Sequence, residues 1–254
     1  MDKGTTMLRN VQLLKWCKQY GVTPAWNLLF GFPGERPEHY RNQLDVIERV
    51  RFLDPPSGWG PVRLDRFSPY FDNPEAYGIT GIRPMAPYRF LYRLPDEDLM
   101  QIASYFDFDY ADGRDPWAYA GPVVDAVLQW MRSERRGGIW LIRGPSGQVT
   151  IVDDRPGSPR RRAVLRDWKA SAYLSCDAAR KPAALLRQDA LHGTSLEELV
   201  GFLDRCVNAG LMISDDGAYL SLAVEVDPPG DPHDAPSRAA EASPGSRYTA
   251  GVAS

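Results

Sequence analysis

Residues 31–35 read Gly-Phe-Pro-Gly-Glu and follow an apolar run near the start of the chain. The two glycines let the backbone approach a ligand closely, and the proline stiffens the turn between them. In α/β folds, loops at the carboxyl ends of buried parallel strands hold ligands, because the sheet keeps them rigid. The segment is therefore a candidate binding loop. The alternative is a structural turn in which Glu35 only stabilises the positive end of the following helix.

Arg63, Asp65 and Arg66 form a second polar group, in a segment whose apolar residues alternate with charged ones. Alternation along a strand places Arg63 and Asp65 on one face and Arg66 on the other. One face alone can point into a site, and the sequence does not decide which. Substrate contact and an Arg–Asp ion pair that stabilises the fold both remain open. Tyr70 follows, the first of several tyrosines that either line a substrate channel or pack a long loop.

The cysteines and histidines predict no metal site. Cys17, Cys176 and Cys206 are far apart and lie in helical, half-apolar segments. This pattern indicates reduced thiols in a protein core rather than a disulfide framework. The histidines have no partners at the spacing of metal ligands.

Hydrophobic periodicity predicts the elements that position these residues. An apolar strand, the loop and an amphipathic helix make one βα unit of a parallel sheet. The expected elements of the first part, residues 1–134, are a helix over 8–20, a strand within 22–30, a helix over 38–53, a loop over 54–61, a strand over 62–67, and helices over 96–106 and 122–132.

A glycine- and arginine-rich stretch at 135–138 indicates a domain boundary. The second part, residues 138–225, combines a β-ribbon with three short helices, which predicts a small α+β, winged-helix-like domain. Its expected elements are strands over 139–142 and 148–152, helices over 163–174, 178–188 and 195–209, and a final strand pair over 211–214 and 218–224. Residues 226–254 are rich in proline, serine and alanine and are expected to be disordered.

Composition excludes several classes of partner. The formal net charge is -3, from 30 basic and 33 acidic residues mixed along the chain, so no field attracts nucleic acid. No apolar run approaches the ~20 residues that span a bilayer, and no secretory signal is present. We therefore expect a cytoplasmic protein that binds neither nucleic acid nor membrane.

The motif GFPGE after an apolar strand, followed by a strand ending in RFSPYF, resembles the last two βα units of the radical S-adenosylmethionine barrel. The surrounding text, LRNVQLLKWCKQYGVTPAWNLLFGFPGE and LDRFSPYFDNPEAYGITGIRP, is similar to cobalamin-binding radical-SAM proteins that modify ribosomally synthesised peptides. The resemblance covers residues 4–132. It implies an α/β fold, a partial TIM-like barrel followed by the winged-helix-like domain.

The resemblance also implies roles for particular residues. The strand and loop would border the adenosyl part of S-adenosylmethionine, and the second strand would face the peptide substrate. The implied cofactor-binding residues are Asn27, Gly31, Phe32, Pro33, Gly34 and Glu35. The implied substrate-binding residues are Arg63, Asp65, Arg66 and Tyr70. The implied reaction is cobalamin-dependent methylation of an unactivated carbon in a ribosomally synthesised precursor peptide.

One departure from the family is informative. Its members hold a [4Fe–4S] cluster with a CxxxCxxC motif, because three thiolates leave one iron free to chelate S-adenosylmethionine. This motif is absent, so we expect the chain alone to bind no cluster and to be inactive. Either a second chain supplies the front half of the barrel, or the reading frame is truncated, which a start at MDKGTT favours.

The second part is similar in layout to domains that bind leader peptides in peptide-maturation enzymes. Such domains add the peptide as a strand to the edge of their ribbon. Ile151 and Val152 on the ribbon, with Leu165 and Trp168 on the facing helix, are the expected groove, or else plain core. A leader-peptide-binding module without catalysis is therefore the alternative function. The run 160–162, three arginines, either binds an acidic peptide or starts a solvated helix.

Overall fold

The computed structural model describes residues 5–133, 137–157 and 161–226. Within them the fold is mixed α/β, with helices and several small sheets, none of which closes into a barrel. None of the described helices combines the length and the apolar character that a bilayer crossing needs. The predicted disordered tail falls almost wholly on residues 227–254, outside the described residues.

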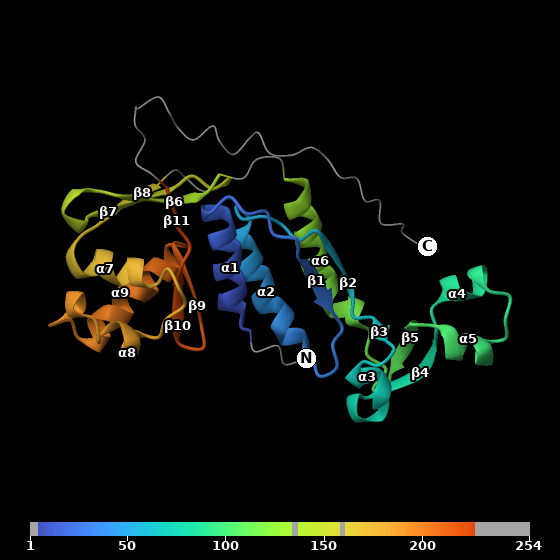
Figure 1. Ribbon diagram of the computed structural model, residues 1–254. Helices are drawn as coiled ribbons and strands as arrows, with labels where there is room; N and C mark the ends of the chain where they lie inside the picture. The colour runs from blue at the N-terminus through green and yellow to red at the C-terminus, as the bar shows by residue number, and fades with distance from the viewer. Residues whose placement is uncertain (1–4, 134–136, 158–160, 227–254) are drawn as a thin grey trace.

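Three helices and two parallel strands form the middle of the molecule (Figure 1). Leu28 and Phe30 of the first strand pack into the core with residues of the helices, whereas Asn27 and Leu29 lie on its other, exposed face. Parallel sheets are usually covered on both faces, so this open face is where a site can form. These elements are α1 (Met7–Gln19), β1 (Asn27–Phe30), α2 (Pro37–Val50), β2 (Gly58–Pro61) and α6 (Pro116–Arg132).

A small antiparallel sheet with short helices extends to one side of this middle layer (Figure 1). Its strand order is β3-β5-β4, and Leu64 of β3 lies beside Phe106 of β5. The elements are β3 (Leu64–Asp65), α3 (Pro69–Asp72), η1 (Pro74–Tyr77), β4 (Ile79–Pro84), α4 (Ala86–Leu91), α5 (Asp96–Ile102) and β5 (Tyr105–Tyr110).

The C-terminal part lies on the opposite side, with helices packed against a sheet of order β11-β6-β7-β8 and a separate β9–β10 hairpin (Figure 1). Ser195 caps the helix α9 in a full capping box with Glu198. The elements are β6 (Ile139–Arg143), η2 (Pro145–Gly147), β7 (Val149–Asp153), β8 (Arg161–Leu165), α7 (Asp167–Ser175), α8 (Pro182–Leu185), η3 (Asp189–Leu191), α9 (Leu196–Asn208), β9 (Met212–Asp215), β10 (Ala218–Ser221) and β11 (Val224–Glu225).

Two hydrophobic cores hold these parts together. The main core joins the middle layer and the C-terminal part, from Leu8 to Val224. The small core lies within the antiparallel sheet and contains four buried residues, Leu64, Ile79, Ala103 and Phe106. The small antiparallel sheet therefore has a core of its own.

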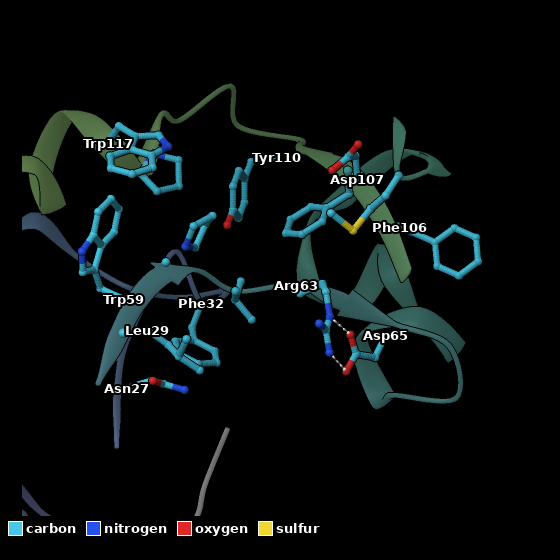
Figure 2. Close-up of a pocket in the computed structure, with 17 residues that line it drawn as sticks. Asn27, Leu29, Phe32, Trp59, Arg63, Asp65, Phe106, Asp107, Tyr110 and Trp117 are labelled. Carbon is cyan, nitrogen blue, oxygen red and sulfur yellow. Dashed lines mark hydrogen bonds and ion pairs between the residues drawn. The ribbon is translucent and has the colours of Figure 1, made fainter. Parts of the chain in front are cut away.

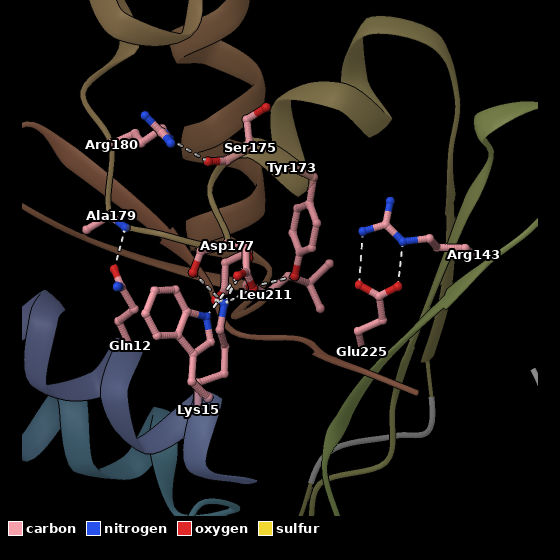
Figure 3. Close-up of polar contacts among 12 residues, drawn as sticks. Gln12, Lys15, Arg143, Tyr173, Ser175, Asp177, Ala179, Arg180, Leu211 and Glu225 are labelled. Atoms are coloured by element: carbon pink, nitrogen blue, oxygen red, sulfur yellow. Dashed lines mark hydrogen bonds and ion pairs between the residues drawn. The ribbon is translucent and has the colours of Figure 1, made fainter. Parts of the chain in front are cut away.

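A buried polar contact fixes α1 against the C-terminal part (Figure 3). The Lys15 side chain is 0% exposed, and its ammonium donates to Asp177 Oδ1 at 2.8 Å, to Asp177 O at 2.9 Å and to Ser221 O at 2.9 Å. Trp16 Nε1 donates to the second carboxylate oxygen of Asp177 at 2.8 Å. Burial lowers the pKa of Lys15, and the bond to Asp177 opposes that shift. The ammonium is therefore removed from water but fully hydrogen-bonded.

Several predicted elements of the first part are wrong. The strand that pairs with β1 is β2, in the segment 54–61 that composition assigns to a loop. The predicted strand over 62–67 is reduced to β3, because the chain turns there to pair with β5. The predicted helix over 96–106 ends at Ile102, and the alternating Phe-Asp-Phe-Asp-Tyr after it forms β5.

The C-terminal part holds two further corrections. The predicted helix over 163–174 begins only at Asp167, and the residues before it form β8, which pairs with β7. The predicted helix over 178–188 is reduced to α8, because Pro182 has no N–H to continue a helix and starts one instead. The predicted hairpin of β6 and β7 and the helix α9 are confirmed.

Candidate functional site

A pocket of about 810 Å³ opens on the exposed face of β1 and β2 (Figure 2). Its other walls come from the loop after β1, from β3 and β5, and from the first turn of α6. The lining residues are Asn27, Leu29, Phe32, Gly58, Trp59, Gly60, Pro61, Val62, Arg63, Asp65, Met85, Phe106, Asp107, Phe108, Tyr110, Pro116 and Trp117.

The floor of the pocket is largely bare backbone. Gly58 and Gly60 of β2 lie beside Asn27 and Leu29 of β1, so this face carries side chains on one strand only. A Cβ at Gly60 would meet nothing within 4 Å, so the space above Gly60 is free, whereas a Cβ at Gly58 would lie 3.1 Å from Asn27 Oδ1. A flat group can therefore lie against this floor without displacing a side chain.

Aromatic rings form one wall. Trp59 and Trp117 meet edge to face at 5.8 Å, and Trp117 packs on Phe30 at 4.8 Å. Trp117 is held there because Asp115 caps α6, its side chain accepting from the Trp117 N–H at 3.0 Å. Trp59 is in register with Leu28, so both indoles lie on the helix side of β2, whereas the bare floor lies on the other side of that strand.

The opposite wall carries the predicted substrate-side charges. Arg63 Nε donates to Asp65 Oδ1 at 2.6 Å and Nη2 donates to Oδ2 at 3.2 Å, and the guanidinium lies over the Tyr105 ring at 3.8 Å. The bond to Asp65 raises the pKa of Arg63. Arg63 and Asp65 thus face the pocket as a preformed pair. Figure 2 shows this pair across the pocket from Trp59 and Trp117.

Arg66 and Tyr70 do not line the pocket. Arg66 points to the other face of the strand and donates to the carbonyl oxygens of Met100 and Ala103, where it caps the C-terminal end of α5. Tyr70 packs edge to face on Tyr77 at 4.7 Å and contacts the small core. The side chains of Arg66 and Tyr70 therefore contact other parts of the small antiparallel sheet and its helices and do not face the pocket.

The loop at residues 31–35 is closed by a polar network around Glu35. Glu35 Oε2 accepts from the Gly31 N–H at 2.7 Å and from the Tyr40 hydroxyl at 2.5 Å. The Tyr110 hydroxyl donates to Gly31 O. Glu35 and Gly31 are therefore committed to the shape of the loop, while Phe32 points into the pocket.

The glycines of this loop adopt a left-handed backbone, with φ of 81° at both Gly31 and Gly34. Gly31 is also crowded, since a Cβ there would lie 2.9 Å from Tyr110 Oη. Gly34 is exposed with nothing within 4 Å, and Pro33 is half-buried between them. Neither Pro33 nor Gly34 lines the pocket.

The tyrosines of this network are hydrogen-bond donors that stay protonated. Burial raises the pKa of Tyr40, and the adjacent Glu35 raises it further. Burial also raises the pKa of Tyr110 to about 12. Both hydroxyls therefore keep their protons at neutral pH, and the loop keeps its shape there.

Ile151 and Trp168, two residues of the predicted peptide groove, are packed against other residues of the C-terminal part. Ile151 is 1% exposed and belongs to β7, which is hydrogen-bonded to β6 on one side and to β8 on the other. Trp168 is half-buried and packs edge to face on Phe202 at 5.5 Å. No strand can be added to β7. Within the described residues, the edge strands of this four-stranded sheet are β8 and β11.

The three cysteines do not form a site. Cys17 is half-buried, and burial raises the pKa of Cys176 to about 12 and that of Cys206 to about 11. Thiolates, not thiols, bind iron, so these two cysteines are poor ligands. In the described ranges no three histidine, cysteine or acidic side chains gather as a metal would require.

Sequence reasoning missed the aromatic wall. Trp59 stands between two glycines and next to a proline, which composition assigns to a loop. Trp117 follows Asp115 and Pro116, a helix-start signal that places the start of α6 here rather than at Pro122. A search for strands that alternate glycine with a large residue would have found Trp59.

Comparison of the chain with models of known protein families, with curated proteins and with solved structures finds no match. The site is therefore interpreted from its own geometry: a bare floor, an aromatic wall, and a charged pair opposite.

Proposed function

We propose that this chain forms the cofactor- and substrate-facing wall of a radical-SAM enzyme that methylates a carbon of a ribosomally synthesised peptide. One observation carries the proposal. Asn27 and Phe32, expected on the cofactor side, and Arg63 and Asp65, expected on the substrate side, line the same pocket. The floor of the pocket, formed by Asn27, Leu29, Gly58 and Gly60, lies on the face of β1 and β2 opposite the helices, which is the inner face in a partial TIM-like barrel.

The pocket residues suit the adenosyl part of S-adenosylmethionine. The volume of the pocket lies within the range of roughly 300–1,000 Å³ that small-molecule sites occupy. A purine can lie against the bare backbone of β2, where the Asn27 amide offers both a donor and an acceptor to its edge. The Arg63–Asp65 pair presents two charges to a peptide approaching from the other wall.

The [4Fe–4S] cluster does not fit the described residues, because no three cysteine, histidine or acidic side chains gather in them as a metal would require. We therefore propose that the cluster is held by residues outside those that the structure describes. Cobalamin is implied by the sequence resemblance alone, and no role assigned here to a residue depends on it.

Equilibrium dialysis with S-adenosylmethionine and with 5′-deoxyadenosine tests the pocket directly. Leu29→Arg places a long cation on the floor and is expected to weaken binding at least about tenfold, or by ~1.4 kcal/mol. Leu13→Arg is the matched control, because Leu13 is also exposed but lies on α1, outside the pocket. Equal binding by both variants, or no binding by the native chain, would reject the proposal.

A second candidate function, peptide binding by strand addition, is favoured by the free edge of β8. Added strands gain affinity from backbone hydrogen bonds along such an edge. In this proposal the C-terminal part is winged-helix-like and binds the leader of the precursor peptide. Hydrogen exchange of the full chain with a short neutral peptide of alternating valine and glutamine should protect the β8 amides. Unchanged exchange at high micromolar peptide would refute it.

A further inference from the structure

Positive charge gathers on β8 and on the start of the helix that follows it. Arg161, Arg162, Arg166 and Lys169 are all exposed, against one acidic residue in the same stretch, Asp167. Within the described residues none of the four cations forms a salt bridge. The free edge of the sheet therefore carries uncompensated positive charge.

The register of the sheet shows what an added strand would meet. Arg161 pairs with Asp153 and Ala163 with Ile151, whose side chains are buried, so these β8 residues face the helices. Arg162 and Val164 lie on the opposite face, and Val164 is 39% exposed. A strand beside β8 would place its side chains next to Arg161 on one face and next to Arg162 and Val164 on the other.

Besides peptide binding, arginines on an edge strand can serve two other purposes. Charged side chains at such an edge prevent copies of a protein from pairing edge to edge. Phosphates of a nucleic acid also attract arginine, but such binding uses cations gathered on one face. Arg161 and Arg162 point to opposite faces, which suits a peptide strand, because its side chains alternate in the same way.

We propose that β8 binds an acidic, extended peptide segment, in which two adjacent carboxylates lie beside Arg161 and Arg162 and an apolar residue lies beside Val164. This inference rests on the proposed peptide-binding function and adds the chemistry of the peptide. The leader segment of the substrate is thus expected to be acidic where it meets the enzyme.

Fluorescence anisotropy of the full chain with labelled peptides tests the inference. The peptide Glu-Glu-Thr-Val-Thr-Glu-Glu reads the same in both directions, so it suits a parallel or an antiparallel strand. Versions with glutamine or lysine in place of glutamate are its matched partners. We expect the glutamate peptide to bind about tenfold more tightly than the glutamine peptide, since several exposed charge pairs act together.

Arg162→Glu should weaken binding of the glutamate peptide roughly tenfold and strengthen binding of the lysine peptide. Arg93→Glu is the control, because Arg93 is an exposed arginine near α4, far from β8 in Figure 1. Equal affinity for the glutamate and glutamine peptides would overturn the acidic preference and leave strand addition standing. Failure of all three peptides to bind would overturn both the acidic preference and the proposed strand addition at β8. Tighter binding of polyuridine, lost in Arg162→Glu, would assign the edge to nucleic acid instead.

Discussion

Glu35 and Lys15 each stand at the centre of a polar network, but the two networks join different parts of the chain. The partners of Glu35 are Gly31 and Tyr40, four and five residues away. The partners of Lys15 are Asp177 and Ser221, which are 162 and 206 residues away. The Glu35 network therefore shapes one loop of the pocket, whereas the Lys15 network fixes α1 against the C-terminal part.

The two networks also differ in burial. Lys15 is fully buried, while Glu35 is half-buried at the edge of the pocket. A charge left without its partner costs most where water cannot reach it. We therefore expect the distant network to matter more for stability and the local network to matter more for ligand binding.

Asp177→Ala is expected to have the largest effect, a loss of about 3 kcal/mol in the free energy of unfolding, because it leaves the buried Lys15 ammonium without a counter-charge. Urea unfolding measures this loss. Glu48→Ala is the matched control, because Glu48 pairs with Arg51 on the surface of α2 with its side chain 59% exposed. That variant should lose less than about 0.5 kcal/mol. Similar losses in both variants would contradict the comparison.

Gly31→Ala and Gly34→Ala form a matched pair within the loop. Both replace a glycine at φ 81°, which costs a residue with a side chain roughly 1–2 kcal/mol. Only Gly31 is crowded by Tyr110 and Pro116, so Gly31→Ala should cost about 1 kcal/mol more. Thermal unfolding of the two variants measures the difference. Equal melting temperatures would show that Tyr110 and Pro116 do not hold the loop.

Glu35→Gln tests the local network alone. The amide oxygen can take the place of Oε2 and accept from both donors, Gly31 N–H and Tyr40 hydroxyl, but it is neutral, so both bonds weaken at a total cost of about 1–2 kcal/mol. We also expect weaker retention of 5′-deoxyadenosine in dialysis, since the loop carries Phe32 in the pocket. Glu38→Gln, on an exposed pair with Arg41, should change neither quantity. If Glu35→Gln changed stability and nucleoside binding as little as Glu38→Gln does, the role of Glu35 in shaping the loop would be refuted.

The smallest expected effect is on pH dependence. The pKa of Cys176 is raised from 9.0 to about 12, so its neutral thiol stabilises the folded state fully below pH 9 and progressively less as pH rises. By one pH unit above 9 the loss is about 1 kcal/mol. Burial also raises the pKa of Cys206, from 9.0 to about 11, so Cys206 adds a similar loss in that interval and Cys176 accounts for only part of the decline. Cys176→Ala should therefore flatten the decline between pH 9 and 10, and an unchanged slope would contradict the assignment.

Elements with local signals were predictable from the sequence. The helices α1 and α2, the strand β1 and the capped helix α9 lie close to their expected positions, because periodicity and caps mark them. The strands β2 and β8 were not predictable from the sequence. The β2 residues, Gly-Trp-Gly-Pro, have the composition of a loop, and the arginines of β8 before Ala163 continue a helical pattern. Each forms a strand because a neighbouring strand offers it a partner.

The candidate site shows the same limit. Arg63 and Asp65 share a face as alternation predicts, but that this face is the one toward the pocket follows from the pairing of β3 with β5. Ile151 and Trp168 were expected to form a groove, and the insertion of β8 beside β7 moves the free edge away from them. The contact of Lys15 with Asp177 depends on segments that no local pattern relates.

The small core has a consequence for how the pocket works. Four buried residues support the wall that carries Arg63 and Asp65, whereas Trp117 of the opposite wall packs on Phe30 of the main core. Units with few buried apolar contacts open locally long before the whole chain unfolds. We therefore expect amide protons of β4 and β5 to exchange ahead of those of β6 and β7. A ligand that touches both walls selects the closed form, so its affinity depends on the local stability of β3–β5 as well as on its own contacts.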